Sequence, residues 1–312
     1  MPRNTKKAFN NKRGGKASKP NLAVVLLIFI VIVQSFLLFK AYAPKNKPSA
    51  HKKPTAPSVS KPPVKKPLPP QTVAVPLPPA PTPGPNVAHG KIVIIIDDSG
   101  YKKSDCDHLA AIDVPVTISI LPELPHSKEV AECAHRQGKE VMLHMPLEPH
   151  VFREQYPEHY FIKTAMSSAQ ISSRLNEALK SMPHIAGINN HEGSKATEDS
   201  RVMYIIFKEL AKRNLFFVDS RVTSKSVCKH LAEKLQLPFA SRDVFLDNVN
   251  ERAAIEKQFD ELTAKANERG VAVAIGHARP VSWDVMEDKV NELKAQGYEF
   301  ITVQQLINSH AQ

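Results

Sequence analysis

Acidic residues are absent from the first third of this chain. No Asp or Glu occurs among residues 1–96, which carry 16 of the 42 Lys and Arg, whereas all 31 acidic residues follow. The overall net charge of +11 therefore belongs to the N-terminal part, because residues 97–312 hold 26 basic and 31 acidic residues, a net charge of −5. A basic pI that arises in this way gives no reason to expect a nucleic-acid partner.

Cysteine is also scarce, with only three residues in the chain: Cys106, Cys133 and Cys228. Three cysteines are too few for a disulfide framework, and neither a CxxC motif nor the Cys/His spacing of a structural zinc site is present. The sequence leaves two possibilities open. Either two cysteines form one bridge and leave a free thiol, or all three are buried thiols.

One apolar stretch in the N-terminal part is long enough to cross a bilayer. Residues 22–39 are apolar at all but two positions, and with the small residues that follow they reach roughly 20 residues, the length of a membrane span. Seven Lys and Arg precede this stretch, and residues 36–40 are a poor context for signal-peptide cleavage. We predict a basic cytoplasmic tail at 1–20 and a single-pass, uncleaved signal anchor at 21–43 in the bacterial inner (plasma) membrane.

Proline dominates the next segment. Residues 44–89 contain 15 of the 26 prolines and few large apolar side chains, so they cannot bury a core and favour extended polyproline II. At about 3.1 Å per residue this segment could reach roughly 140 Å. We predict a disordered spacer at 44–89 that holds a folded domain, residues 90–312, outside the membrane. About 215 residues are enough for one domain with a sizeable core.

Short apolar runs alternate with amphipathic segments from residue 91 onward. Gly138, Gly270 and Gly297 each stand between a predicted helix and the next predicted strand, a position typical of the residue after a helix. Seven or eight such units predict an α/β fold with a parallel sheet, and their number favours a distorted (β/α) barrel over an open doubly wound sheet. The expected strands are 92–96, 116–121, 140–144, 185–188, 215–218, 271–276 and 298–302, with a weaker one near 238–246, and the expected helices are 103–112, 126–137, 168–181, 198–213, 224–236, 251–269 and 283–296.

Polar residues follow the predicted strands at their C-terminal ends, where parallel α/β folds carry their active sites. Asp97 and Asp98 end the first strand, and two adjacent carboxylates there are costly unless a partner such as a metal ion compensates their charge. Later strands supply the other candidates, which are His144, Asn190, His191, Asp219, Ser220, His277 and Arg279.

These residue types fit metal-assisted hydrolysis of an amide or ester. Two histidines and one carboxylate around an open coordination position form a catalytic metal arrangement, which fits zinc and other divalent ions as well. A second carboxylate can take a proton from water, and a histidine on the far side can donate one to the leaving group. Asp219 and Ser220 keep an alternative role that the sequence leaves open, as the cap of the helix predicted near residue 224.

Five motifs occur in a fixed order along the folded part: Ile96-Asp97-Asp98-Ser99-Gly100, Leu143-His144-Met145-Pro146-Leu147-Glu148-Pro149, Gly187-Ile188-Asn189-Asn190-His191-Glu192-Gly193-Ser194, Phe217-Val218-Asp219-Ser220-Arg221 and Ile275-Gly276-His277-Ala278-Arg279-Pro280. With them, the chain resembles the divergent polysaccharide deacetylases, distant relatives of the metal-dependent polysaccharide deacetylases, over about residues 91–308. The resemblance implies a distorted βα barrel and a bound divalent metal ion. It also implies that Asp97 is the catalytic base, Asp98 a metal ligand and His277 the general acid.

One position departs from the related deacetylases, which usually supply two metal-binding histidines four residues apart. Here Glu148 stands four residues after His144. We predict that His191 replaces the missing ligand, with Glu148 as the weaker candidate. The residues expected to orient these groups or the substrate are Asn190, Asp219, Ser220 and Arg279.

The sequence thus favours a membrane-anchored hydrolase that removes acetyl groups from an N-acetylated glycan of the bacterial cell envelope. A second hypothesis is a glycoside hydrolase with Asp97 and Asp98 as its carboxylate pair, but adjacent residues rarely flank a bond as that chemistry requires. A third hypothesis is a non-catalytic glycan-binding or scaffold protein of the envelope that retains a metal site.

Overall fold

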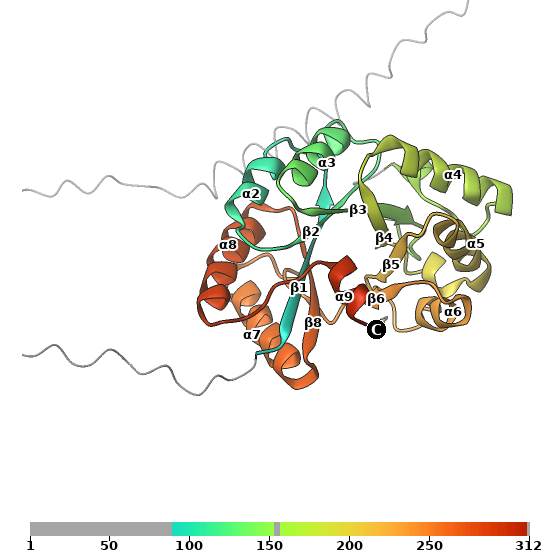
Figure 1. Ribbon diagram of the computed structural model, residues 1–312. Helices are drawn as coiled ribbons and strands as arrows, with labels where there is room; N and C mark the ends of the chain where they lie inside the picture. The colour runs from blue at the N-terminus through green and yellow to red at the C-terminus, as the bar shows by residue number, and fades with distance from the viewer. Residues whose placement is uncertain (1–88, 153–156, 311–312) are drawn as a thin grey trace, which may run out of the picture. The chain divides into compact units, whose positions relative to one another are not determined.

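The computed structural model describes residues 89–152 and 157–310. Within them, eight parallel strands form one curled sheet of order β6-β5-β4-β3-β2-β1-β8-β7 (Figure 1). This order runs around a barrel, but β6 and β7, the two edge strands, do not pair with each other. The predicted distorted barrel is confirmed as a curled parallel sheet that stays open between these strands. The strands are β1 (Lys91–Ser99), β2 (Thr117–Ile120), β3 (Glu140–Leu147), β4 (Ile185–Glu192), β5 (Phe216–Asp219), β6 (Phe239–Ser241), β7 (Val244–Phe245) and β8 (Val271–His277).

Helices follow most of the strands and cover the outside of the sheet (Figure 1). All seven predicted helices are present, and Gly270 ends the longest with a φ of 82°, a left-handed conformation that suits glycine. An eighth helix at the end of the domain was not predicted. The helices are α2 (Asp105–Ala111), α3 (Ser127–Arg136), α4 (Ser168–Ser181), α5 (Ser200–Ala211), α6 (Cys228–Leu235), α7 (Arg252–Arg269), α8 (Pro280–Ala295) and α9 (Val303–His310), with short 3₁₀ turns at Glu158–Tyr160 and Ala196–Glu198.

Side chains inside the curl of the sheet form a core of their own, which α9 completes. Val93, Ile95, Val273 and Ile275 of β1 and β8 pack in one cluster with apolar residues of α9. The carboxylate of Glu140, the first residue of β3, accepts hydrogen bonds from backbone N–H groups in the first turn of α9. Because anionic groups stabilise helix N-termini, this contact fixes α9 against the N-terminal end of the barrel. The opposite end, where the strands finish, remains accessible.

Two predicted strands differ from the structure. Residues 298–302 make only one isolated bridge, between Phe300 and Ile92, because β2 pairs with β1 from Ile95 onward and leaves just the start of β1 open on that side. The weak strand near 238–246 is divided into β6 and β7. Arg242 lies between them, and its Nε donates a hydrogen bond to the carbonyl of Ser220 beyond β5.

The structure decides between the two alternatives for the cysteines, in favour of one disulfide and one free thiol. Cys106 of α2 and Cys133 of α3 form a disulfide, and Cys228 is a buried free thiol. No helix within residues 89–152 and 157–310 is both long and apolar enough to cross a bilayer. The predicted tail at 1–20, the anchor at 21–43 and the spacer at 44–89, apart from its last residue, lie outside the described residues.

Candidate metal centre and active site

A backbone irregularity at the end of β1 presents two successive carboxylates to one cavity. Side chains of neighbouring strand residues normally point to opposite faces. Asp98 has a φ of 61°, and the pairing of β1 with β2 shifts register between Ile96 and Ser99. This left-handed conformation costs about 1–2 kcal/mol for a residue other than glycine. It allows both Asp97 and Asp98 to line the cavity.

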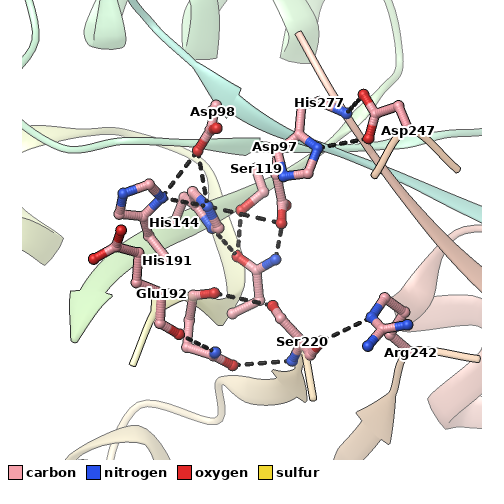
Figure 2. A network of polar contacts seen from close by, with 12 residues as sticks. Asp97, Asp98, Ser119, His144, His191, Glu192, Ser220, Arg242, Asp247 and His277 are labelled. Carbon is pink, nitrogen blue, oxygen red and sulfur yellow. Dashed lines mark hydrogen bonds and ion pairs between the residues drawn. The ribbon is translucent and has the colours of Figure 1, made fainter. Parts of the chain in front are cut away.

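Three ligand atoms, one each from Asp98 of β1, His144 of β3 and His191 of β4, lie close together (Figure 2). Asp98 Oδ1 lies 3.2 Å from His144 Nε2 and 3.0 Å from His191 Nδ1, and these two nitrogens are 3.2 Å apart. β3 and β4 run side by side with Pro146 opposite His191, which brings the two histidines to the same end of the sheet. The three predicted metal ligands therefore form a nearly equilateral triangle.

The triangle has the dimensions of a metal site. Ligands about 2.1 Å from one ion are separated by about 3.0–3.4 Å in octahedral or tetrahedral geometry. Asp98 Oδ1 is buried, and its contacts among the described residues are the two imidazole nitrogens. One carboxylate and two imidazole nitrogens are a donor set that zinc and other divalent ions accept. These three residues fit the metal ion that the sequence predicts.

The protonation of the triangle without a cation follows from its charges. Burial raises the pKa of Asp98, but hydrogen bonds and charges from His144 and His191 outweigh burial and hold it well below its usual range. Burial lowers the pKa of His144, yet the charges of Asp97 and Asp98 raise it to about 9. A metal ion must therefore displace a proton from His144 at neutral pH.

Asp97 lies beside the triangle with a separate set of contacts. Its Oδ1 accepts a hydrogen bond from Asn189 Nδ2 at 2.7 Å, and its Oδ2 is 3.7 Å from His144 Nε2. The side chain is only 2% exposed. Burial raises the pKa of Asp97 despite the neighbouring imidazoles, which favours a carboxyl that accepts protons more readily than a solvated aspartate. A cation at the triangle would shift this pKa in the opposite direction.

His277 occupies another edge of the same cavity and has its own carboxylate partner (Figure 2). His277 Nδ1 lies 2.7 Å from Asp247 Oδ1, and Asp247 Oδ2 accepts hydrogen bonds from the His277 backbone N–H and from the Ser282 hydroxyl. Burial lowers the pKa of His277, but the hydrogen bond and charge of Asp247 outweigh it and raise this pKa above its usual value of 6.5. Arg279 donates to the carbonyl of Asp247 at 3.1 Å and also lines the cavity.

The other predicted residues divide into two groups. Asn190 and Ser220 line the cavity and bind each other, because Asn190 Oδ1 accepts the backbone N–H of Ser220 at 2.9 Å. Asp219 is turned away from the cavity, where its carboxylate accepts hydrogen bonds from the Arg221 N–H and the Ser226 hydroxyl. The capping alternative is wrong, because Val227 is the N-cap residue of α6; Asp219 instead orders the loop that precedes this helix.

Glu148, the weaker ligand candidate, does not join the triangle. Its carboxylate accepts hydrogen bonds from the backbone and hydroxyl of Thr164, and from Lys195 Nζ at 2.9 Å. His144 lies within β3, which continues to Leu147, and Glu148 comes directly after the strand. The four-residue spacing therefore runs along an extended chain. On a helix, the same spacing would bring both side chains to one face.

Asn189, Ser119 and Asp247 have roles in the structure that the sequence does not predict. Asn189 stands next to Asn190 in one motif, but only Asn190 is among the predicted supporting residues. Ser119 was hidden within an apolar strand, and Asp247 follows the two-residue strand β7, which periodicity cannot detect. The rule that sites lie at strand ends could have found Asp247 if β7 had been recognised.

The cavity that these residues surround has a volume of about 800 Å³, within the range of small-molecule sites. Its floor is polar, whereas its rim includes Tyr101, Val151 and Val222 with 45%, 78% and 36% of their surface exposed. Such a combination suits a ligand with both polar groups and apolar faces.

Two bacterial proteins are similar in sequence to this chain. Protein YibQ of Escherichia coli is 33% identical over 207 residues, which are 66% of this chain and 64% of YibQ. A Haemophilus influenzae protein is 33% identical over 206 residues, which are 66% of this chain and 73% of that protein. The match thus spans slightly less than two thirds of the length of YibQ.

A solved structure shares the fold. Protein ATU2773 from Agrobacterium tumefaciens superposes with a TM-score of 0.66 at 22% identity, over 72% of this chain and 92% of that chain. The family model of the divergent polysaccharide deacetylases matches residues 94–307, a range that contains every residue of the triangle and the His277 pair. The chain therefore belongs to the divergent polysaccharide deacetylase family.

Proposed function

We propose that this protein is a metal-dependent deacetylase that acts on an N-acetylated glycan of the bacterial cell envelope. The observation that carries the proposal is the triangle of Asp98, His144 and His191, with Asp97 beside it and His277 lining the same cavity. The description of the family, divergent polysaccharide deacetylase, supports the substrate class.

The proposed roles follow from the needs of amide hydrolysis. Water adds to the acyl carbon and the C–N bond breaks, so one group must remove a proton from water and another must protonate the nitrogen. Asp98, His144 and His191 would hold a divalent ion, preferably zinc, and this ion would supply Lewis acidity for the carbonyl oxygen and the attacking water. Asp97 accepts the proton of the attacking water. His277 donates its proton to the leaving nitrogen, and the products are acetate and a free amine.

The proposed location rests on one observation of the structure and one prediction from the sequence. The disulfide between Cys106 and Cys133 is typical of proteins that reside in an oxidising compartment. The predicted anchor at 21–43 would leave the folded domain on the outer side of the inner membrane. Reporter fusions at residue 60 and at the C-terminus should be active only in their exported form. Activity of cytoplasmic reporters at both positions would refute this topology.

The enzymatic proposal is tested by acetate release. Purified protein loaded with zinc is incubated with chitin oligomers and with peptidoglycan fragments, next to the same protein treated with a chelator. We expect acetate from at least one of these glycans, only with metal present. Stoichiometric zinc binding without acetate from any acetylated glycan would favour the alternative of a non-catalytic glycan-binding or scaffold protein.

A further inference from the structure

Asn189 lies at the centre of the polar network beneath the cavity. It is not one of the three proposed metal ligands, and it does not line the cavity. It belongs to β4 and has no exposed surface. Its Oδ1 faces His144 Nδ1 at 2.7 Å and accepts the Ser119 hydroxyl, and its Nδ2 donates to Asp97 Oδ1 at 2.7 Å. Both ends of one buried amide are thus in use.

The chemistry of these partners determines the direction of each hydrogen bond. An ionised carboxylate only accepts, so the NH₂ group of Asn189 must face Asp97. The amide oxygen then faces His144, and it can only accept, so Nδ1 of His144 must carry the proton. Nε2 of His144 is left with its lone pair toward Asp98 and His191, as a metal ligand requires.

We infer that Asn189 is a positioning residue that couples the metal ligand His144 to the base Asp97. It holds His144 in the tautomer that can bind a metal, and with the same amide it orients the carboxylate that takes the proton from water. A partner of this kind beyond the direct ligands typically changes metal affinity by about 10–100-fold. The catalytic half of the inference rests on the proposed function, whereas the metal-binding half does not.

The neighbouring asparagine shows that the position, not the residue type, is decisive. Asn190 points to the other side of β4, as alternation along a strand demands, and its amide binds the backbone at Glu192 and Ser220. Asn189 alone among the described residues connects a triangle residue with Asp97 through side-chain hydrogen bonds.

The test separates the two arms of the amide with two substitutions. Asn189→Ala removes both arms and leaves the tautomer of His144 undetermined. Asn189→Asp keeps an oxygen that can accept from His144 and Ser119, but it replaces the donor to Asp97 with a second acceptor. Asn248→Ala serves as a matched control, because Asn248 is an exposed asparagine at the rim of the same cavity.

Zinc affinity of the full-length protein is measured by competition with a chromogenic chelator, and the fold is checked by circular dichroism. We expect Asn189→Ala to weaken zinc binding by about 10–100-fold, with Asn189→Asp restoring affinity to within about 3-fold of wild type. Asn248→Ala should bind zinc as wild type does. Acetate release should be reduced in both Asn189 variants, since both lose the donor to Asp97.

Three outcomes would overturn the inference. Wild-type zinc affinity in Asn189→Ala would show that His144 needs no help from this amide. Equal weakening in the Ala and Asp variants would contradict the inference, because the oxygen that the Asp variant retains would then give His144 no support. If Asn189→Ala does not fold, the isosteric Asn189→Asp variant decides alone, and weakened zinc binding in it contradicts the inference. A protein that shows the expected affinities but no acetate release would refute the proposed function and leave the tautomer role intact.

Discussion

On one side of the cavity, His144 and His191 turn ring nitrogens toward each other and toward Asp98; on the other side, His277 turns toward Asp247 alone. We call the first group (Asp98, His144 and His191, with Asn189 behind them) the metal side. The second group (Asp247, His277 and Ser282) is the proton side.

The two sides show how surroundings assign different tasks to one kind of side chain. Two imidazole nitrogens 3.2 Å apart repel each other through their lone pairs unless a proton or a cation lies between them. His277, in contrast, already has a carboxylate 2.7 Å from its Nδ1 and needs only a proton to form an ion pair. The metal side therefore needs a proton or a cation between its imidazoles, whereas the proton side needs no cation.

The largest expected effect tests whether only the metal side holds the ion. Asp98→Ala should abolish measurable zinc binding and reduce acetate release to background, because it removes the one anionic ligand of the triangle. His277→Ala should keep stoichiometric zinc and lose activity. Zinc content is measured by metal analysis after gel filtration and activity by acetate release, with His230→Ala, an exposed histidine of α6, as control. Loss of zinc in His277→Ala would end the distinction between the two sides.

The next effect concerns the base, which touches the metal side without belonging to it. Asp97→Asn should retain zinc and fold, because Asp97 is not one of the three triangle ligands. Its turnover should fall by roughly 10²–10⁴-fold, the usual contribution of a positioned base. The measurement is acetate release by zinc-loaded protein at saturating substrate. Equal rates in the variant and wild type would remove Asp97 from the mechanism.

A smaller effect addresses the proton side through its pH dependence. Asp247 raises the pKa of His277 above 6.5 against the opposing effect of burial, so the acid form persists at higher pH than in free histidine. Asp247→Asn should move the alkaline limb of the rate profile to lower pH by about one pH unit. An unmoved limb would show that another group donates the proton.

The same pair links stability to pH. The raised pKa of His277 stabilises the fold below pH 6.5, and this contribution is lost as pH rises through that pKa. The pKa of Asp247 is lowered because His277 and Ser282 outweigh its burial, so its contribution is lost as pH falls through a value below 3.8. The free energy of unfolding of wild type and Asp247→Asn should therefore differ most between about pH 4 and pH 6.5.

The smallest effect has the opposite sign. Ser282 donates a hydrogen bond to Asp247 Oδ2 and draws charge away from the carboxylate. Ser282→Ala should move the alkaline limb of the rate profile to higher pH by a few tenths of a pH unit. It should also lower the free energy of unfolding by about 1 kcal/mol. Urea titrations and rate profiles measure the two quantities. A downward shift of the limb would mean that Ser282 acts on His277 by another route.

Much of the metal side could be predicted from the sequence, for a definite physical reason. Parallel strands all end at the same edge of the sheet, so residues such as His144 and His191, which follow buried apolar runs, must come close together. The geometry of Asp98 could not be predicted in this way. Its left-handed backbone depends on the local register shift between β1 and β2, which no periodicity reveals.

On the proton side, the sequence predicts His277 but not its partner Asp247. His277 follows the long, regular strand β8, whereas Asp247 follows β7, whose two residues leave no recognisable alternation. The choice between Asn189 and Asn190 depends on which of two adjacent residues faces the barrel interior. A shift of one residue reverses that assignment, so it requires the register of the whole sheet.

The central position of β1 in the sheet affects how the chain folds during its synthesis. The five residues from Ile92 to Ile96 form a fully buried strand, whose hydrogen bonds to β8 join residues 91–97 to residues 271–277. During synthesis this apolar strand is exposed, with one edge open, until residues 271–277 have emerged, and such edges recruit other chains. We expect a chain that ends at Gly270 to aggregate when a chaperone is absent, as measured by sedimentation. A soluble, monomeric truncation would show that α7 alone can shield the unpaired edge.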